Sequence, residues 1–132
     1  VDTPDNIEQY AKVSRASTAC PPRISQYAAI EALKDDSHVR EMREAYQRRR
    51  DALVEEMNDL GWDFVAPEGA IYAFPEVGED SWDFCMRMID EGVAMVPGDP
   101  MGPESNQNVR ICFGSTTEEE IREAFQRINE AV

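Results

Sequence analysis

The chain has 132 residues, of which 42% are hydrophobic and 30% are charged, and this length is typical of one domain. Its formal net charge is −14, and a field of that sign repels phosphate backbones, which argues against nucleic-acid binding. The longest uncharged apolar stretches fall far short of the roughly 20 residues that cross a bilayer, so we predict no membrane span.

The cations are almost all arginine, since Lys12 and Lys34 are the only lysines. A surface rich in carboxylates and poor in lysine stays soluble in concentrated salt, which screens its self-repulsion beyond about 3 Å at 1 M. We interpret the composition as that of a halophile's protein. A mesophilic acidic domain that prefers arginine is the alternative.

The three cysteines, Cys20, Cys85 and Cys112, are odd in number and far apart, and none belongs to a Cys-x-x-Cys pair. This pattern argues against both a disulfide framework and a zinc site, and it predicts a reduced, cytoplasmic protein. The chain opens on Val1 without an initiator methionine, so the sequence looks like a piece excised from a longer protein.

Three helices are expected in the first half of the chain. Asp5 or Asn6 is a suitable cap for a helix through about Ala16, and Pro21-Pro22 separates it from a second helix that begins near Arg23. A third, long helix is predicted from about residue 37 to 60, with Gly61 as its stop. Its predicted packing positions are Val39, Met42, Tyr46, Leu53, Met57 and Leu60.

After Gly61 the apolar period changes to two. Residues 62–65 and 70–74 are predicted as strands of a hairpin around Pro67-Glu68-Gly69. A helix capped by Asp80 or Ser81 follows and ends at Gly92, with its apolar stripe predicted at Trp82, Cys85, Met86 and Ile89.

The last quarter should contain two more strands, a loop and a helix. The strands are predicted at 93–96 and 109–113, separated by a surface loop rich in proline and glycine. Thr116 and Glu119 have the spacing of a capping box for a last helix, whose buried face is predicted at Ile121, Phe125, Ile128 and Val132. The expected fold is an α/β two-layer domain over residues 1–132, with helices packed on a short mixed or antiparallel sheet.

Most charged residues have a structural interpretation. The only histidine, His38, has no second histidine or nearby cysteine with which to form a metal or nucleophile site, so we expect it to face solvent. Arg48, Arg49 and Arg50 point in three directions on a helix, and we expect them to pair with Glu44 and neighbouring carboxylates.

Arg110 differs, because it lies within the strand predicted at 109–113. A cation near a sheet needs an anionic partner, and a guanidinium can donate two parallel hydrogen bonds to one carboxylate. The residues alone leave two interpretations open, a structural ion pair and a site for a substrate carboxylate.

Five motifs occur in an order that resembles the C-terminal small domain of the class I/II, fold-type I aminotransferases, the aspartate aminotransferase family, which use pyridoxal phosphate. Two of them are P-x-G-A-x-Y-x-F-P, at residues 67–75, and G-V-A-x-x-P-G followed by a glycine, at residues 92–102. The others are V-R-I at 109–111, Y-x-x-R-R-D at 46–51, and the segment from Cys20 to Ala29.

This resemblance implies roles for two arginines. In the family the arginine of V-R-I binds the substrate α-carboxylate, which would be the role of Arg110. Arg15 stands six residues before Pro21, where aspartate aminotransferases place an arginine that reaches into the partner subunit to bind a distal carboxylate. Ala19-Cys20 here replaces the family's Ser-Asn, and this departure weakens the assignment.

The resemblance also implies a pyridoxal phosphate enzyme that exchanges an amino group between an amino acid, aspartate among the candidates, and a 2-oxo acid. The expected parent is a haloarchaeal, cytoplasmic homodimer. Neither Lys12 nor Lys34 has the setting of the family's cofactor-binding lysine, so we expect the cofactor-binding large domain to be absent here and the isolated chain to be inactive. The alternatives are a stand-alone acidic binding domain and another fold-type I activity, which the upstream gene sequence would separate.

Overall fold

The computed structural model describes residues 3–132, which divide into two compact units with their boundary between Arg40 and Glu41. The first unit contains α1 (Pro4–Ser17) and α2 (Arg23–Ala32), and the break at Pro21-Pro22 is confirmed. The cap of α1 is Thr3, whose hydroxyl accepts a 3.4 Å hydrogen bond from the Asn6 amide, so the predicted cap at Asp5 or Asn6 is wrong. Neither helix buries a residue.

The predicted long helix is confirmed as α3 (Ser37–Asp59), and Gly61 follows it with a φ of +71°. A positive φ suits glycine because it has no Cβ to clash with the preceding turn. Leu53 and Met57 are buried as predicted, whereas Val39 and Met42 are exposed. Val39 and Met42 lie in the N-terminal part of α3, ahead of the buried positions, which begin at Ala52.

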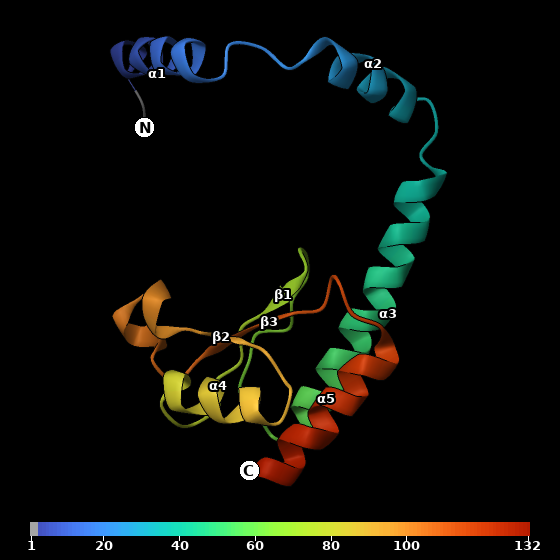
Figure 1. Cartoon of the computed structure of the whole chain (residues 1–132), viewed down its shortest axis with the longest axis vertical. Coiled ribbons are helices and arrows are strands. Elements are labelled where there is room, and N and C mark those ends of the chain that lie inside the picture. Colours follow the sequence, from blue (N-terminus) through green and yellow to red (C-terminus); the bar gives the residue numbers. More distant parts are fainter. Residues whose placement is uncertain (1–2) are drawn as a thin grey trace. The chain divides into compact units, whose positions relative to one another are not determined.

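The second unit also holds three short strands and two more helices (Figure 1). They are β1 (Tyr72–Ala73), α4 (Ser81–Asp90), β2 (Val96–Pro97), β3 (Val109–Cys112) and α5 (Glu118–Ala131). The strands form an antiparallel sheet in the order β1-β3-β2. The predicted fold class, helices packed on a short antiparallel sheet, is thereby confirmed.

The predicted hairpin between residues 62–65 and 70–74 is wrong. β1 pairs with β3 instead, and Asp63 makes one isolated bridge, with Glu76. The neighbouring aromatic residue Trp62 packs toward the core, where its ring lies 5.9 Å from that of Phe84 and 5.5 Å from that of Phe125. Residues 62–65 are therefore held by packing of Trp62 into the core and not by strand pairing with residues 70–74.

Two details of the later helices also differ from prediction. The cap of α4 is Asp80, as predicted, but its buried face is Phe84, Cys85 and Met88, and Trp82, Met86 and Ile89 are exposed. The capping box of α5 is formed by Thr117 and Glu120, one residue later than predicted, and Val132 is exposed. The loop between β2 and β3 contains two 3-10 turns, Asp99–Met101 and Pro103–Ser105.

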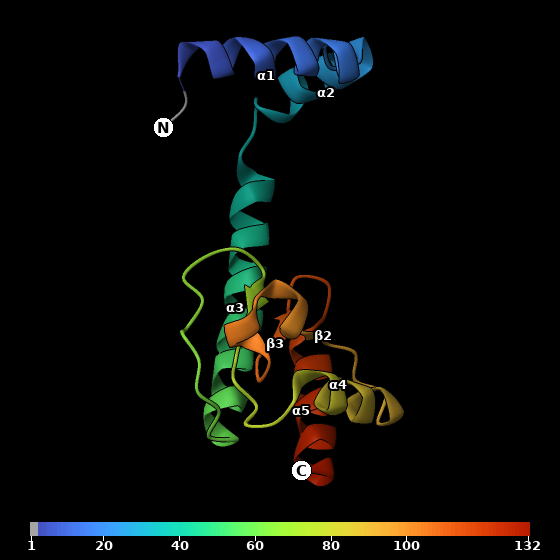
Figure 2. The same ribbon diagram turned by 90° about the vertical axis from the view of Figure 1, so that its left-hand side faces the viewer.

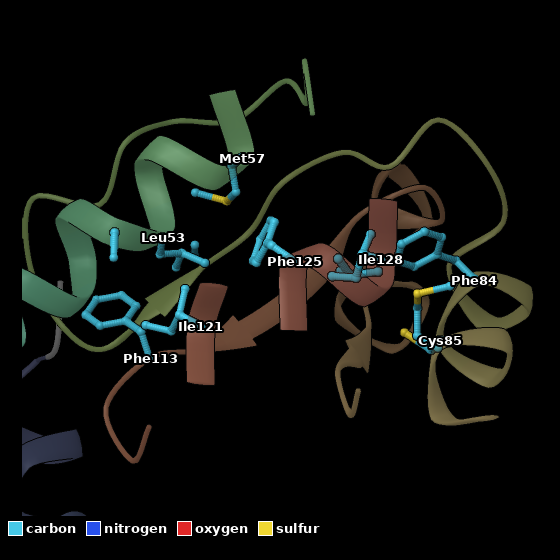
Figure 3. Close-up of a cluster of buried hydrophobic side chains, with 12 residues drawn as sticks. Leu53, Met57, Phe84, Cys85, Phe113, Ile121, Phe125 and Ile128 are labelled. Carbon is cyan, nitrogen blue, oxygen red and sulfur yellow. The ribbon is translucent and has the colours of Figure 1, made fainter. Parts of the chain in front are cut away.

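The core of the second unit joins α3, α4, α5 and β3. Figure 3 shows Leu53 and Met57 of α3 facing Ile121 and Phe125 of α5. The exposed sides of these two helices are also connected, because Arg122 bonds Glu55 at 2.7 Å and Glu56 at 2.8 Å. The C-terminal half of α3 therefore runs beside α5, as Figure 2 also shows.

Candidate functional site

The candidate site lies on the exposed face of the small sheet. Tyr72 is opposite Cys112, and Val96 is opposite Arg110, so these four side chains share one face because directly paired residues point the same way. Tyr72 and Val96 are 44% and 39% exposed.

The other face of the sheet turns toward the core. Ala73 and Val109, which point to that side, are 3% and 0% exposed. A strand alternates its side chains between faces, so burying Val109 presents Arg110 on the opposite side. The hydrophobic core thus determines which way the candidate arginine points.

Arg110 is half-buried, and its guanidinium carbon lies 4.9 Å from the centroid of the Tyr72 ring. Among residues 3–132, no carboxylate forms an ion pair with it. The structural ion pair considered from the sequence is therefore absent within the described residues. Arg110 keeps hydrogen-bond donors that can meet an anion from outside this part of the chain.

The N-terminal end of β3 is held by a close backbone approach at Gly98. A Cβ at this position would lie 2.4 Å from the carbonyl oxygen of Ser105 and 2.6 Å from that of Asn108. The Gly98 amide also donates a 2.8 Å hydrogen bond to the Asn108 carbonyl. The glycine of the P-G motif therefore lets the loop close tightly against the residue that precedes β3.

The C-terminal end of β3 is held by two hydrogen bonds and by a close approach of Gly114 to Ile71. The Phe113 amide donates a 3.0 Å hydrogen bond to the Ile71 carbonyl, and a Cβ on Gly114 would lie 2.9 Å from Cδ1 of Ile71. Nη1 of Arg49, in α3, donates a 2.8 Å hydrogen bond to the Gly114 carbonyl. Both ends of the strand that carries Arg110 are thus fixed.

Arg50, the next residue in α3, anchors the loop before β1. Its Nε donates a 3.0 Å hydrogen bond to the Pro67 carbonyl, and its Nη1 donates a 2.8 Å bond to Asp51. Hydrogen bonding from Arg50 lowers the pKa of Asp51 below its ordinary value. This loop also contains Ala70 at a φ of +60°, a conformation that costs a non-glycine residue free energy.

The prediction that Arg48, Arg49 and Arg50 pair with Glu44 and neighbouring carboxylates holds only for Arg50, which pairs with Asp51 at 2.8 Å. Arg48 pairs with Glu118 of α5 at 3.0 Å, and the other two bind backbone carbonyls. These anchoring roles could not be predicted from local sequence because the acceptors lie 17 to 70 residues away along the chain. The Y-x-x-R-R-D motif indicated that these arginines have a role in the family, but it gave no information on which carbonyl groups accept their hydrogen bonds.

The remaining candidates lie elsewhere. Arg15 is exposed in the last turn of α1, in the first unit, where a cation suits the helix dipole, and its substrate role stays a prediction. His38 is exposed, as expected. Cys20 and Cys112 are free and exposed, while burial raises the pKa of the free Cys85 thiol.

Two kinds of feature are absent from residues 3–132. No three side chains among the histidines, cysteines and carboxylates there gather closely enough to hold a metal ion. None of the helices in that range combines the length and apolar character that crossing a membrane requires.

Comparison with known proteins gives the family. Residues 3–128 match the family model described as aminotransferase class I and II. The chain is 37% identical over 128 residues to an aspartate/prephenate aminotransferase from Thermus thermophilus, covering 92% of this chain and 32% of the relative. It is 33% identical over 127 residues to a (5-formylfuran-3-yl)methyl phosphate transaminase from Methanocaldococcus jannaschii, covering 94% of this chain and 34% of the relative.

Solved structures agree with this match. A Methanococcus jannaschii protein, whose active site is described as similar to that of kynurenine aminotransferases, superposes with a TM-score of 0.86 at 32% identity, over 98% of this chain and 36% of that one. A Thermus thermophilus aspartate aminotransferase variant superposes with a TM-score of 0.81 at 36% identity, over 97% of this chain and 36% of that one.

The chain belongs to the class I and II aminotransferase family. It spans about a third of the length of the curated relatives it matches.

Proposed function

We propose that residues 1–132 are the C-terminal part of an aminotransferase that moves an amino group between an amino acid and a 2-oxo acid, with Arg110 binding the substrate α-carboxylate. The observation that carries this proposal is the state of Arg110 itself. It stands on an exposed sheet face, in a strand held at both ends, and no carboxylate of residues 3–132 pairs with it.

Such an arginine can both bind and orient a substrate. A guanidinium donates two parallel N–H bonds to one carboxylate, which restricts rotation of the substrate as well as its position. Fixing the reacting bond in this way supplies part of the catalytic effect that an enzyme gains from orientation. The fixed backbone on both sides of Arg110 supports that role, because a mobile strand would lose the orientation.

Pyridoxal phosphate is the cofactor that the family implies, and it supplies the electron sink for the exchange when bound. The described residues do not fit its attachment. Lys12 and Lys34, the only lysines, are exposed and pair with the nearby carboxylates of Glu8 and Glu31, at 3.0 and 2.7 Å. The proposal therefore assigns cofactor binding to a large domain outside these 132 residues.

The proposal includes the setting of the parent protein. We infer a cytoplasmic homodimer from a haloarchaeon, with aspartate as one candidate substrate. Arg15 is the second candidate binding residue, for the distal carboxylate of a substrate held by the partner subunit. The relatives support only the aminotransferase class, since the activities for which they are named include aspartate, aromatic and other substrates.

The central test is Arg110→Lys in the full-length protein. Lysine keeps the charge but loses the two-point fork, and a charged hydrogen bond is worth roughly 1.5 to 3 kcal/mol, so kcat/KM should fall by about one to two orders of magnitude. Arg127→Lys is the control, because Arg127 already bonds Glu123 and the Glu91 carbonyl within the chain, and it should leave kcat/KM unchanged. A lower melting temperature with unchanged activity of the folded fraction would contradict the proposal.

A second test uses the 132-residue chain alone. We expect it neither to transaminate nor to form a stable covalent adduct with pyridoxal phosphate, because both lysines are surface residues. The measurement is the visible absorption spectrum after mixing, followed by borohydride reduction and mass analysis. One stoichiometric modified lysine would show that this part of the chain does hold the cofactor.

A further inference from the structure

We propose that Tyr72 is a positioning residue for Arg110, and that the flat face of its ring fixes the plane in which the guanidinium meets a substrate carboxylate. This inference rests on the proposed function of Arg110. It concerns a residue that does not itself bind the carboxylate. Its role is to restrict the side-chain conformations of Arg110 before the substrate binds, so that less conformational entropy is lost on binding.

The strand register brings the two side chains together. Tyr72 pairs directly with Cys112, and Arg110 lies two residues before Cys112 in β3, so Tyr72 and Arg110 are diagonal neighbours on one face. Diagonal neighbours in an antiparallel pair are within reach of aromatic and long side chains. The guanidinium carbon is 4.9 Å from the ring centroid, closer than in the stacks of Arg87 on Phe84 at 5.4 Å and of Arg49 on Tyr46 at 5.6 Å.

The contact leaves the binding edge of the arginine free. A guanidinium stacks on an aromatic ring through its planar face, while its N–H donors point outward in the plane. The other two stacked arginines use those donors within the protein, Arg87 on Glu79 and Arg49 on the Gly114 carbonyl. The Arg110 guanidinium also lies over an aromatic ring, yet no ion pair within residues 3–132 engages it.

The ring of Tyr72 contributes little to the core. It is 44% exposed, whereas its strand neighbour Ala73 is 3% exposed and supplies the buried contact of β1. The aromatic ring at this position is thus free to contact the Arg110 guanidinium on the exposed side of the sheet. Without the ring, the long arginine side chain would regain rotamers, and binding a carboxylate would cost that side-chain entropy.

The test compares Tyr72→Phe and Tyr72→Leu in the full-length protein. Phenylalanine keeps the ring, and we expect KM for the amino acid to stay within about twofold. Leucine removes it, and because a cation–π contact is worth about 0.5 to 2 kcal/mol, KM should rise by roughly twofold to thirtyfold with a smaller change in kcat. Tyr72→Thr, which also suits a strand, should behave like leucine and serves if the leucine variant does not fold.

The double variant Tyr72→Leu with Arg110→Lys separates this inference from the proposed function. If the ring acts through the guanidinium, adding Tyr72→Leu to Arg110→Lys should cause little further loss. Trp82→Leu is the control, since it removes another exposed aromatic ring, on α4, and should leave KM unchanged.

Each other outcome contradicts one of the two proposals. If Arg110→Lys leaves kcat/KM unchanged, the proposed function is wrong. If Arg110→Lys is impaired but Tyr72→Leu keeps a normal KM, or if the two losses add fully, Arg110 binds the carboxylate without help from Tyr72. If Tyr72→Phe is as impaired as Tyr72→Leu, the hydroxyl matters and the stacking role is wrong.

Discussion

Arg49 in α3 donates a 2.8 Å hydrogen bond to the carbonyl oxygen of Gly114, 65 residues further along the chain. Gly114 stands two residues after β3, so the long helix fixes the end of the strand that carries Arg110. The helix thereby contributes to the candidate site without placing a side chain in it.

Arg49→Met tests the contribution of this bond to stability. The variant keeps much of the side chain's bulk and removes the donor, so the free energy of unfolding should fall by about 1.5 kcal/mol. Arg48→Met is the matched control, because its pair with Glu118 is exposed and should be worth less than about 0.5 kcal/mol. Urea unfolding of the 132-residue chain measures both variants. Equal decreases in the free energy of unfolding would show that the bond to Gly114 stabilises the chain no more than an exposed ion pair does.

Gly98→Ala tests the close approach before β3. The new Cβ would lie 2.4 Å and 2.6 Å from two backbone carbonyl oxygens, which cannot move aside as a flexible side chain could. Overpacking of this kind costs about 1 to 3 kcal/mol, so the melting temperature should fall by several degrees. Gly69→Ala is the control, since nothing lies within 4 Å of its Cβ. Matching melting temperatures for the two variants would contradict the packing described at Gly98.

The positions of the helices and the break at Pro21-Pro22 could be predicted because they depend on local chemistry. Capping residues, proline and glycine act within a few residues of their position, so errors there are one or two residues, as with Thr117 in place of Thr116. The direction of Arg110 could not be predicted this way. It depends on the burial of Val109 and on pairing with β1 and β2, which are distant in the sequence.

The face of α4 illustrates the same limit. Periodicity allows either Trp82, Met86 and Ile89 or Phe84 and Met88 to be buried, because apolar residues surround much of this helix. The structure buries Phe84 against Trp62, a contact that no local pattern contains. The family resemblance made Arg110 a candidate substrate-binding residue, which periodicity alone could not do, because the V-R-I motif is associated with a role and not only with a strand.

The ion pair between Glu79 and Arg87 predicts a pH dependence of stability. Arg87 donates bonds of 2.6 and 3.0 Å to the two carboxylate oxygens, and this hydrogen bonding lowers the pKa of Glu79. A carboxylate whose pKa is lowered on folding stabilises the protein above its unfolded value, about 4.3, and that contribution is lost as the pH falls toward the folded value.

Glu79→Gln measures the size of that contribution. The amide does not titrate, so the melting temperature of the variant should fall less steeply than that of the wild type between about pH 5 and pH 3, and the two curves should approach each other at the acid end. Glu104→Gln, in the exposed loop before β3, is the control and should keep the wild-type slope. Parallel curves for the wild type and Glu79→Gln would show that the pair is too exposed to matter.

Salt dependence tests the halophilic interpretation of the composition. Concentrated KCl weakens exposed ion pairs such as Arg122 with Glu55, but solvent-exposed pairs contribute little to stability. The same salt screens repulsion within a chain of net charge −14, and that repulsion involves every unpaired carboxylate. Relief of repulsion should therefore outweigh the loss of pairs, and the melting temperature should be several degrees higher in 2 M than in 0.1 M KCl.

A variant with fewer charges separates screening from general salt effects on apolar burial. Asp90→Asn, Glu104→Gln and Glu119→Gln together remove three exposed carboxylates, none of which pairs with a cation within residues 3–132. With less repulsion to screen, this variant should melt higher than the wild type in 0.1 M KCl and gain less from 2 M KCl. A melting temperature that stays flat or falls with KCl in the wild type would overturn the halophilic interpretation, because repulsion among the carboxylates would then be too weak to limit stability.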